Sequence, residues 1–136
     1  MILKVFTDGG SKGNPGPSSI GGVGYIDSKK VFDFKKSIGI ATNNDAEYRA
    51  LIEALSNIKN QKSKIKNTYQ ISKIEFSSDS RLMVNQVKGL FKVKNERIKK
   101  YILIIRGLEQ EINLPISYHY VPREQNVEAD LLVNSV

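Results

Sequence analysis

The sequence contains no cysteine, and its only histidine is His119. Without cysteine the chain can form neither disulfides nor thiolate metal sites, and this composition is typical of an intracellular protein. No run of about 18 apolar residues occurs, so we expect no membrane-spanning helix. The N-terminal stretch MILKVFTDGG lacks the basic and then apolar layout of a signal peptide. The absences together predict a cytoplasmic protein.

The charges that are present are mostly basic. Lysine and arginine number 21 against 14 aspartate and glutamate, which gives a net charge of +7. A basic surface favours a polyanionic partner such as a nucleic acid. The 136 residues correspond to one domain, which we expect over 1–136, and they suffice to bury a sizeable core. No pattern indicates oligomerisation, so a monomer is expected.

The order of the predicted elements indicates an α/β fold. Apolar runs and alternation predict strands over 2–7, 20–27, 31–40, 71–78 and 115–121. Apolar residues at helical spacing predict helices over 44–58, 80–87, 95–112 and 126–134. Short turns make the first three strands an antiparallel meander. The helices between the later strands predict parallel pairing through right-handed crossovers.

Polar residues at the helix starts match known caps. Asn44 and Glu47 have the spacing of a capping box for the first helix. The second helix would be capped by Asp79 or by Ser80. The lysine-rich segment 59–69 that follows the first helix is predicted to be a loop.

Four acidic residues lie where apolar or structural residues are expected. Asp8 directly follows the apolar run 2–6, and Asp79 directly follows the strand predicted at 71–78. Glu47 continues the apolar stripe of the first helix, and Asp130 lies on or beside the packing face of the last one. In open α/β sheets, ligands bind outside the carboxyl ends of the strands. One end of the sheet could therefore gather all four carboxylates.

Each acid alone also has an ordinary structural explanation. These are a turn for Asp8, a capping box for Glu47, a helix cap for Asp79 and solvent exposure for Asp130. Gathered carboxylates, however, raise one another's pKa unless a cation neutralises them. With no cysteine and one histidine, a hard cation such as Mg²⁺ or Mn²⁺ fits best. Carboxylate-held Mg²⁺ beside a basic surface indicates phosphoryl chemistry on a nucleic acid.

Four segments in order carry a resemblance to a known family: FTDGGSKGNPGP, TNNDAEYRALIEAL, FSSDSRLMVNQVKG and VPREQNVEADLLVN. With them the chain resembles ribonuclease H of type 1 (RNase HI), in its compact archaeal and bacterial form. The resemblance implies the ribonuclease H-like fold, a five-stranded mixed sheet with three antiparallel and then two parallel strands and helices on both faces. It also implies hydrolysis of the RNA strand of RNA/DNA hybrids, giving 5′-phosphate and 3′-hydroxyl ends.

The resemblance implies roles for particular residues. The metal-binding carboxylates would be Asp8, Glu47, Asp79 and Asp130, holding two Mg²⁺ ions for which Mn²⁺ can substitute, with Asp8 bridging both. Substrate contacts, including detection of the RNA 2′-hydroxyl, would come from Gly9, Gly10, Ser11, Asn14, Thr42, Asn43, Asn44, Ser80 and Arg81. Because glycine has no side chain, the backbone at Gly9 and Gly10 could come close to the substrate. The asparagines have turn and cap chemistry as an alternative role.

The chain departs from the family pattern in the loop before Asp130. Many members have a histidine there, whereas this loop reads VPREQN. Arg123 or Glu124 could take over part of its role, and we favour Arg123 as a further catalytic residue because a fixed cation can hold a phosphate. A solvated loop arginine is the alternative. His119 is expected to be a structural or surface residue of the last strand.

Two lysine-rich segments have different expected roles. Residues 88–100 are expected to flank the hybrid by contacting phosphates, with a solvated helix start as the alternative. The segment 59–66 follows the far end of the first helix, so we expect it to lie away from the metals.

Three functions remain open on the sequence. The first is a Mg²⁺-dependent endoribonuclease acting on RNA/DNA hybrids. The second is a related nuclease, either one that also cuts double-stranded RNA or a domain derived from a reverse transcriptase. The third is a non-catalytic hybrid-binding module, which the complete set of four acids argues against.

Overall fold

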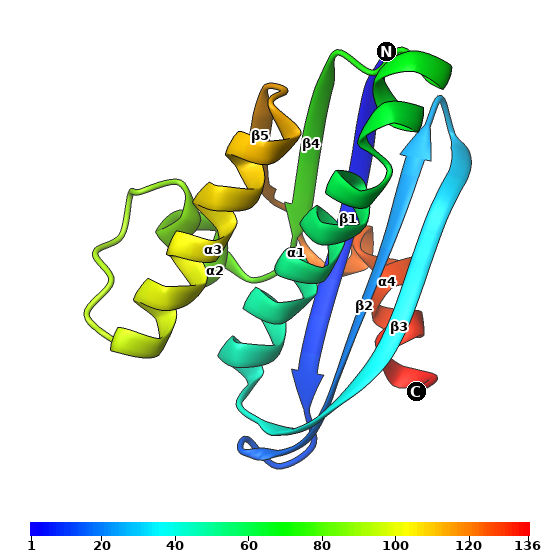
Figure 1. The fold of residues 1–136 in the computed structure, drawn as a ribbon. Coiled ribbons are helices and arrows are strands. Elements are labelled where there is room, and N and C mark those ends of the chain that lie inside the picture. Colours follow the sequence, from blue (N-terminus) through cyan, green and yellow to red (C-terminus); the bar gives the residue numbers. More distant parts are fainter.

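The computed structural model describes all 136 residues, and its centre is one five-stranded sheet (Figure 1). The strands follow one another in space in the order β3-β2-β1-β4-β5. The elements in chain order are β1 (Ile2–Ser11), β2 (Gly16–Ile26), β3 (Lys29–Ala41), α1 (Asn43–Asn60), a π-helical turn (Lys64–Thr68), β4 (Lys73–Ser78), α2 (Arg81–Val87), α3 (Glu96–Ile112), β5 (Ile116–Tyr120), a 3₁₀ turn (Arg123–Gln125) and α4 (Val127–Asn134).

The pairing of the strands confirms the predicted mixed sheet. β2 pairs antiparallel with both β1 and β3, while β4 pairs parallel with both β1 and β5. A tight turn at Asp27 and Ser28, both with positive φ, joins β2 to β3. Two residues in this conformation match the twist of a hairpin. The parallel pairs need the longer connections that α1, α2 and α3 supply.

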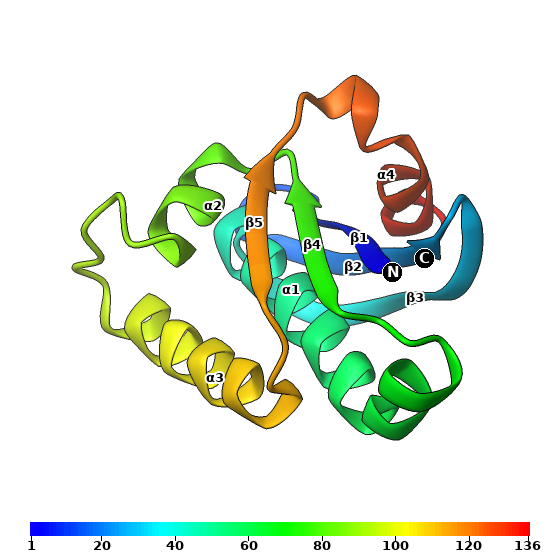
Figure 2. The same ribbon diagram turned by 90° about the horizontal axis from the view of Figure 1, so that it is seen from above.

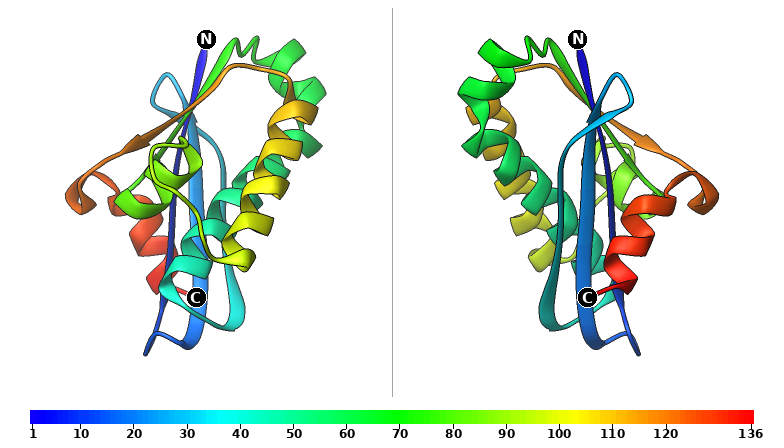
Figure 3. Two further views of the ribbon diagram at one scale, coloured as in Figure 1. Left: turned by 90° about the vertical axis from the view of Figure 1, so that its left-hand side faces the viewer. Right: turned by 90° about the vertical axis from the view of Figure 1, so that its right-hand side faces the viewer.

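Helices cover both faces of the sheet, as predicted. Figure 3 shows α1 and α3 on one side and α4 on the other, and Figure 2 shows α2 beside β5. The main core lies under α1, whose Leu51, Leu55 and Ile58 are fully buried. The stripe predicted on the third helix is also present, since Ile98, Ile105 and Ile112 of α3 are buried. None of the helices combines the length and apolar character needed to cross a membrane.

The start of α1 differs from the prediction. The N-cap is Thr42, whose hydroxyl accepts a hydrogen bond from the backbone N–H of Asp45, while the Asp45 carboxylate accepts one from the backbone of Thr42. The predicted capping box of Asn44 and Glu47 is therefore wrong. The same polar spacing occurs twice, two residues apart, and the earlier pair forms the cap. Glu47 is thereby released from the cap, and its side chain is available to face the sheet.

The segment after α1 also differs from the prediction. The helix continues to Asn60, and Lys64–Thr68 forms a π-helical turn where a loop was expected. This turn is ordered by Ile65, which is buried in the core. At α2 the structure chooses between the two predicted caps, because the Ser80 hydroxyl accepts from the backbone N–H of Met83. The helix and strand types predicted for the rest of the chain are correct, with ends shifted by a few residues.

Candidate active site

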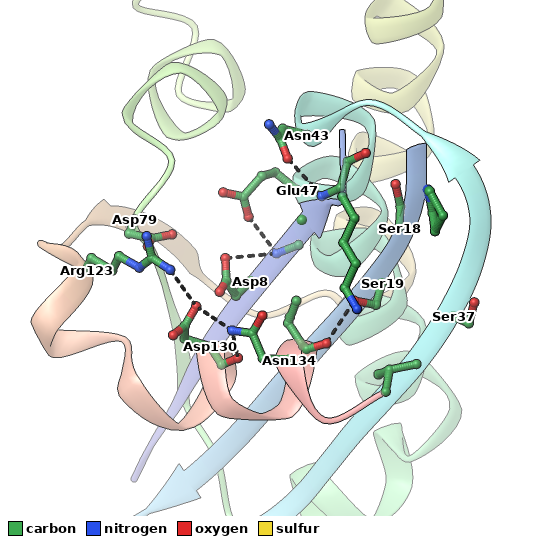
Figure 4. Close-up of a pocket in the computed structure, with 17 residues that line it drawn as sticks. Asp8, Ser18, Ser19, Ser37, Asn43, Glu47, Asp79, Arg123, Asp130 and Asn134 are labelled. Carbon is green, nitrogen blue, oxygen red and sulfur yellow. Dashed lines mark hydrogen bonds and ion pairs between the residues drawn. The ribbon is translucent and has the colours of Figure 1, made fainter. Parts of the chain in front are cut away.

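The predicted acids meet at the end of the sheet where β1 and β4 cease to pair. The last register pair of these parallel strands is Phe6 with Ser77. Asp8 lies two residues further along β1, and Asp79 directly follows β4. Glu47 comes from α1 on one face of the sheet and Asp130 from α4 on the other (Figure 4). All four line one open cleft of about 500 Å³.

Three of the four acids form a close cluster. Carboxylate oxygens of Asp8, Glu47 and Asp79 all lie within 4.8 Å of one another. Asp130 lines the same cleft and lies near enough to Asp8 to affect its pKa, but it stands outside this group of three. The cleft thus brings together one acid from β1, one from the end of β4, one from α1 and one from α4.

Gly9 explains how Glu47 comes so close to Asp8. The backbone N–H of Gly9 donates to Oδ1 of Asp8 at 3.0 Å and to Oε1 of Glu47 at 2.9 Å. A Cβ on Gly9 would lie 2.3 Å from the carbonyl carbon and oxygen of Ala46. Any side chain at this position would push α1 away from β1. The sequence suggested that Gly9 lets the substrate come close to the backbone. In the structure its missing side chain lets α1 pack close against β1.

A second glycine admits the helix that carries Asp130. A Cβ on Gly21 would lie 3.0 Å from Cβ of Leu132 and 3.1 Å from the carbonyl oxygen of Ala129. Contacts this short force the neighbour to move, and here the neighbour includes backbone. Glycine at this point of β2 therefore allows α4 to pack directly on the sheet.

Burial and mutual repulsion perturb the cluster strongly. The pKa of Asp8 is raised to about 8, first by burial and then by the charges of Asp79 and Asp130, against the opposing effect of the Gly9 N–H. The pKa of Glu47 is raised well above its ordinary value by burial and by the charges of Asp8 and Asp79. Repulsion of this kind is relieved by a bound cation. A donor set made of carboxylate oxygens fits a hard divalent ion.

The loop after β1 is joined to the start of α1 by two hydrogen bonds. The backbone N–H of Ser11 donates to Oδ1 of Asn43 at 2.8 Å, and that of Asn43 donates to Oδ1 of Asn14 at 2.9 Å. Ser11 and Asn43 line the cleft together with Gly9 and Gly10. Ser11 and Asn43 therefore have structural partners and also border the site, whereas Asn14 contacts Asn43 from outside the lining of the cleft.

The remaining predicted substrate residues lie outside the lining of the cleft. Thr42 caps α1, Ser80 caps α2, and Asn44 is half-buried in the first turn of α1. Arg81 is exposed at the start of α2, with its guanidinium over the ring of Tyr120. The cleft lining therefore includes only part of the predicted substrate-contacting set.

The loop without the expected histidine presents an arginine. Nη2 of Arg123 lies 3.4 Å from Oδ1 of Asp130, and Arg123 lines the cleft with 75% of its side chain exposed. Glu124 is exposed in the same 3₁₀ turn and does not line the cleft. His119 is an exposed residue of β5, as expected, and its Nε2 lies 2.9 Å from Oγ of Ser117.

Sequence reasoning missed Asn126, which connects three parts of the site. Its Nδ2 donates to the carbonyl of Thr7 at 2.9 Å, its backbone N–H donates to the carbonyl of Arg123, and its own carbonyl accepts from the N–H of Asp130. Asn126 is only 1% exposed, and its Oδ1 has no hydrogen-bond partner. The sequence marked it only as the start of the last helix. The cleft also contains residues that were not predicted: Lys12, Ser19, Ser37 and Asn134.

A mixed sheet of this order, with acids gathered at the ends of β1 and β4, defines the ribonuclease H-like class of proteins. The sequence matches the family described as reverse transcriptase-like over residues 6–136. Two solved structures are similar over nearly the whole chain. LC11-RNase H1 in complex with an RNA/DNA hybrid has a TM-score of 0.88 and 34% identity, covering 98% of this chain and 95% of that one. RNase H1 from Halobacterium salinarum has a TM-score of 0.87 and 32% identity, covering 99% and 96%.

Curated sequences agree with the structures. The ribonuclease HI of Halobacterium salinarum is 34% identical over 133 residues, which are 97% of this chain and 62% of that protein. The chain belongs to the ribonuclease HI family. Bifunctional protein Rv2228c of Mycobacterium tuberculosis is 36% identical over 138 residues, or 98% of this chain. The chain spans about a third (35%) of the length of that mycobacterial relative.

Proposed function

We propose that residues 1–136 form one ribonuclease H domain, an endonuclease that hydrolyses the RNA strand of RNA/DNA hybrids and leaves 5′-phosphate and 3′-hydroxyl ends. The observation that carries this proposal is the cluster of Asp8, Glu47 and Asp79, whose carboxylate oxygens lie within 4.8 Å of one another in an open cleft. Membership of the ribonuclease HI family supports it. So does the similarity to LC11-RNase H1, a protein solved with a bound hybrid.

The four acids would hold two divalent ions. The donor set supports Mg²⁺, with Mn²⁺ able to substitute. When bound, such ions would supply a lowered pKa for the attacking water and a positive charge beside the leaving oxygen. Asp8 is close to Glu47 and Asp79 and also to Asp130, so we assign it to both ligand sets. The Gly9 N–H fixes the carboxylates of Asp8 and Glu47 relative to each other before any ligand binds.

Recognition of the RNA strand is assigned to the rim of the cleft. Gly9, Gly10, Ser11 and Asn43 line it and can contact the sugars, where the 2′-hydroxyl distinguishes RNA from DNA. Asn14, Thr42, Asn44, Ser80 and Arg81 would contact the hybrid further out. The basic segment 88–100 would contact phosphates, which add affinity without sequence preference.

Arg123 is proposed to assist the reaction in place of the family's loop histidine. Its guanidinium lies beside Asp130 at the edge of the cleft and is largely exposed. From there it can hold the phosphate that is attacked or the phosphate that is released. Arginine is always protonated, so it can hold a phosphate without taking up a proton, whereas a histidine must first be protonated to carry a positive charge.

The proposal is tested by incubating the purified protein with RNA/DNA hybrid, double-stranded RNA and double-stranded DNA, each with Mg²⁺ and with Mn²⁺. We expect cleavage of the RNA strand of the hybrid and no cleavage of DNA. Asp8→Asn should lower the rate by at least about 100-fold, because loss of a direct metal ligand should cost more than the roughly 10- to 100-fold typical of a residue behind the ligands. Cleavage of double-stranded RNA at a similar rate would favour the broader nuclease. Hybrid binding without cleavage would favour a binding module, and Asp8→Asn with normal turnover would refute the assigned site.

The protein is proposed to act as a monomer in the cytoplasm. Light scattering of the protein with and without hybrid measures its mass in solution. A dimer at concentrations used for cleavage would contradict this part of the proposal.

A further inference from the structure

Arg81 and Tyr120 form a stacked pair at the edge of the site. The guanidinium carbon of Arg81 lies 4.8 Å from the centre of the Tyr120 ring. An arginine within about 6 Å of an aromatic ring is attracted to the ring face. Both side chains are exposed, so the pair is accessible to a large ligand.

Arg81 differs from the other arginines in having no polar partner in the protein. Arg97, Arg106 and Arg123 each pair with a carboxylate, and Arg49 donates to a backbone carbonyl. Arg81 makes no ion pair and no side-chain hydrogen bond. The one charge-dependent contact of its guanidinium is with the ring of Tyr120. The N–H groups at the edge of its guanidinium are therefore free to bind an external acceptor.

The register of the sheet places this pair next to the acid cluster. Tyr120 of β5 pairs with Ser78, the last residue of β4, and Asp79 follows Ser78 directly. Arg81 comes two residues after Asp79, as the first residue of α2. Figure 2 shows α2 beside the end of β5. A nucleic-acid strand whose reacting phosphate lies in the cleft beside Asp79 would therefore run close to Arg81 with a neighbouring phosphate.

An arginine held over an aromatic ring is well suited to a phosphate. The N–H groups of Arg81 have no partner in the protein, and a guanidinium can match two phosphate oxygens at once. The ring also restricts a flexible side chain, so less conformational entropy is lost when the ligand binds.

We propose that Arg81 binds a backbone phosphate of the strand being cut, next to the cleaved bond, and that Tyr120 is the positioning residue that holds Arg81 in place. This inference rests on the proposed function, because it requires a hybrid strand in the cleft. It adds Tyr120, a residue outside the cleft lining, to the residues that determine affinity for the hybrid.

The first experiment measures hybrid binding in the inactive Asp8→Asn background at several salt concentrations, together with KM and kcat in the active protein. Arg81→Ala is expected to weaken binding and raise KM about five- to tenfold, with kcat within about twofold, because one phosphate contact is lost. The slope of log affinity against log salt should fall in magnitude by about 0.9, the value for one phosphate. Arg81→Lys retains the charge and should keep most of that slope while losing part of the affinity.

The second experiment separates positioning from direct contact. Tyr120→Leu is expected to raise KM about two- to fivefold, the range for an exposed cation–aromatic pair, while Tyr120→Phe keeps the ring and should restore the wild-type value. In the Arg81→Ala background, Tyr120→Leu should have no further effect, because Tyr120 acts through Arg81.

The chain offers a matched control pair at the other end of the molecule. Nζ of Lys64 lies 5.5 Å from the centre of the Tyr69 ring, in and beside the π-helical turn after α1. Lys64→Ala and Tyr69→Leu remove the same chemistry and should leave KM and the salt slope unchanged.

The outcomes distinguish this inference from the function on which it rests. An unchanged salt slope in Arg81→Ala, or an effect of Tyr120→Leu that persists without Arg81, overturns the inference even if the hybrid is cleaved normally. Equal effects in the Lys64 and Tyr69 controls overturn it as well. If the protein binds the hybrid through Arg81 but does not cleave it, the phosphate contact stands and the proposed activity falls. If it neither binds nor cleaves, both fall.

Discussion

Nδ2 of Asn126 donates a hydrogen bond of 2.9 Å to the carbonyl oxygen of Thr7, across 119 positions of the chain. Thr7 immediately precedes Asp8, and Asn126 immediately precedes the helix that carries Asp130. One buried side chain thus ties together the backbones that present two of the proposed metal ligands. The loop of Arg123 is attached to the same residue through the Asn126 N–H.

Replacing Asn126 by alanine should therefore affect both stability and catalysis. The Thr7 carbonyl would lose its side-chain donor, which costs about 1–3 kcal/mol when a buried group is left unpaired. Turnover should fall about tenfold or more, because small displacements of reacting groups are costly. Urea unfolding measures the first effect, and kcat together with calorimetric Mn²⁺ affinity measures the second.

Asn67→Ala is the matched control for this variant. Asn67 also donates from its side-chain amide, to Ser63 on the exposed surface after α1. We expect neither stability nor turnover to change by more than the scatter of surface substitutions. A folded Asn126→Ala protein with wild-type kcat and Mn²⁺ affinity would reduce Asn126 to a purely structural role.

The acid cluster predicts how stability depends on pH in the absence of metal. The pKa of Asp8 is raised from 3.8 to about 8 in the folded protein, and that of Glu47 is also raised. The folded state therefore holds more protons than the unfolded state between about pH 4 and pH 8, and stability must fall as the pH rises through this range. We expect a loss on the order of 1 kcal/mol per pH unit in EDTA, measured by urea unfolding.

Two comparisons check the source of this pH dependence. Excess Mg²⁺ should flatten the decline, because the ion binds the ionised carboxylates of the folded state. Asp8→Asn in EDTA should flatten it as well, since one of the two perturbed carboxyls is gone and its charge no longer raises the pKa of Glu47. Stability that rises with pH over this interval in EDTA would contradict the predicted protonation of the cluster.

The sequence was sufficient to predict the elements and the acids because these follow from local patterns. Asp8 and Asp79 directly follow predicted strands, and Glu47 continues the apolar stripe of the first helix, so their positions at one end of the sheet followed from the order of strands and helices. The cap of α1 could not be chosen in this way. Two overlapping polar pairs fit the same rule, and the choice depends on Asp45 reaching Arg97 and Tyr101 of α3.

Other features depend on contacts that spacing does not encode. The link from Asn126 to Thr7 and the stacking of Arg81 on Tyr120 join residues far apart in the chain. Gly9 looked like a loop glycine, whereas it lies within β1 and is required by the backbone of Ala46. In each case the partner is determined by how a helix or loop packs on the sheet, and only the packed structure identifies it.

Asp45 gives a pH dependence of opposite sign. Its carboxylate accepts from Nε of Arg97 at 2.6 Å and from the Thr42 hydroxyl at 2.9 Å, and its pKa lies below the ordinary value because these hydrogen bonds outweigh burial. A lowered pKa contributes stability above about pH 4, which is lost as the pH falls through the folded pKa. Asp45→Ala should lower the free energy of unfolding at pH 7 by about 1–2 kcal/mol, because the hydrogen bonds that its carboxylate accepts from Thr42 and Arg97 are lost.

The measurement is urea unfolding of wild type and Asp45→Ala at pH 7 and at pH 3. The difference between the two proteins should shrink at pH 3. Asp33→Ala serves as the control, because the ion pair of Asp33 with Lys30 is exposed and contributes little. A difference that grows at low pH would contradict the lowered pKa of Asp45.

Arg123 and His119 compete for the role of the absent loop histidine, and their positions favour Arg123. Arg123 lines the cleft beside Asp130, whereas His119 lies on exposed β5 with Ser117 as its partner. Arg123→Ala should lower single-turnover cleavage of the hybrid about tenfold, equivalent to about 1.4 kcal/mol in the barrier, and His119→Ala should change it by less than twofold. Arg123→Lys retains a cation without the planar fork and should recover part of the rate. A larger loss in His119→Ala than in Arg123→Ala would reverse the assignment.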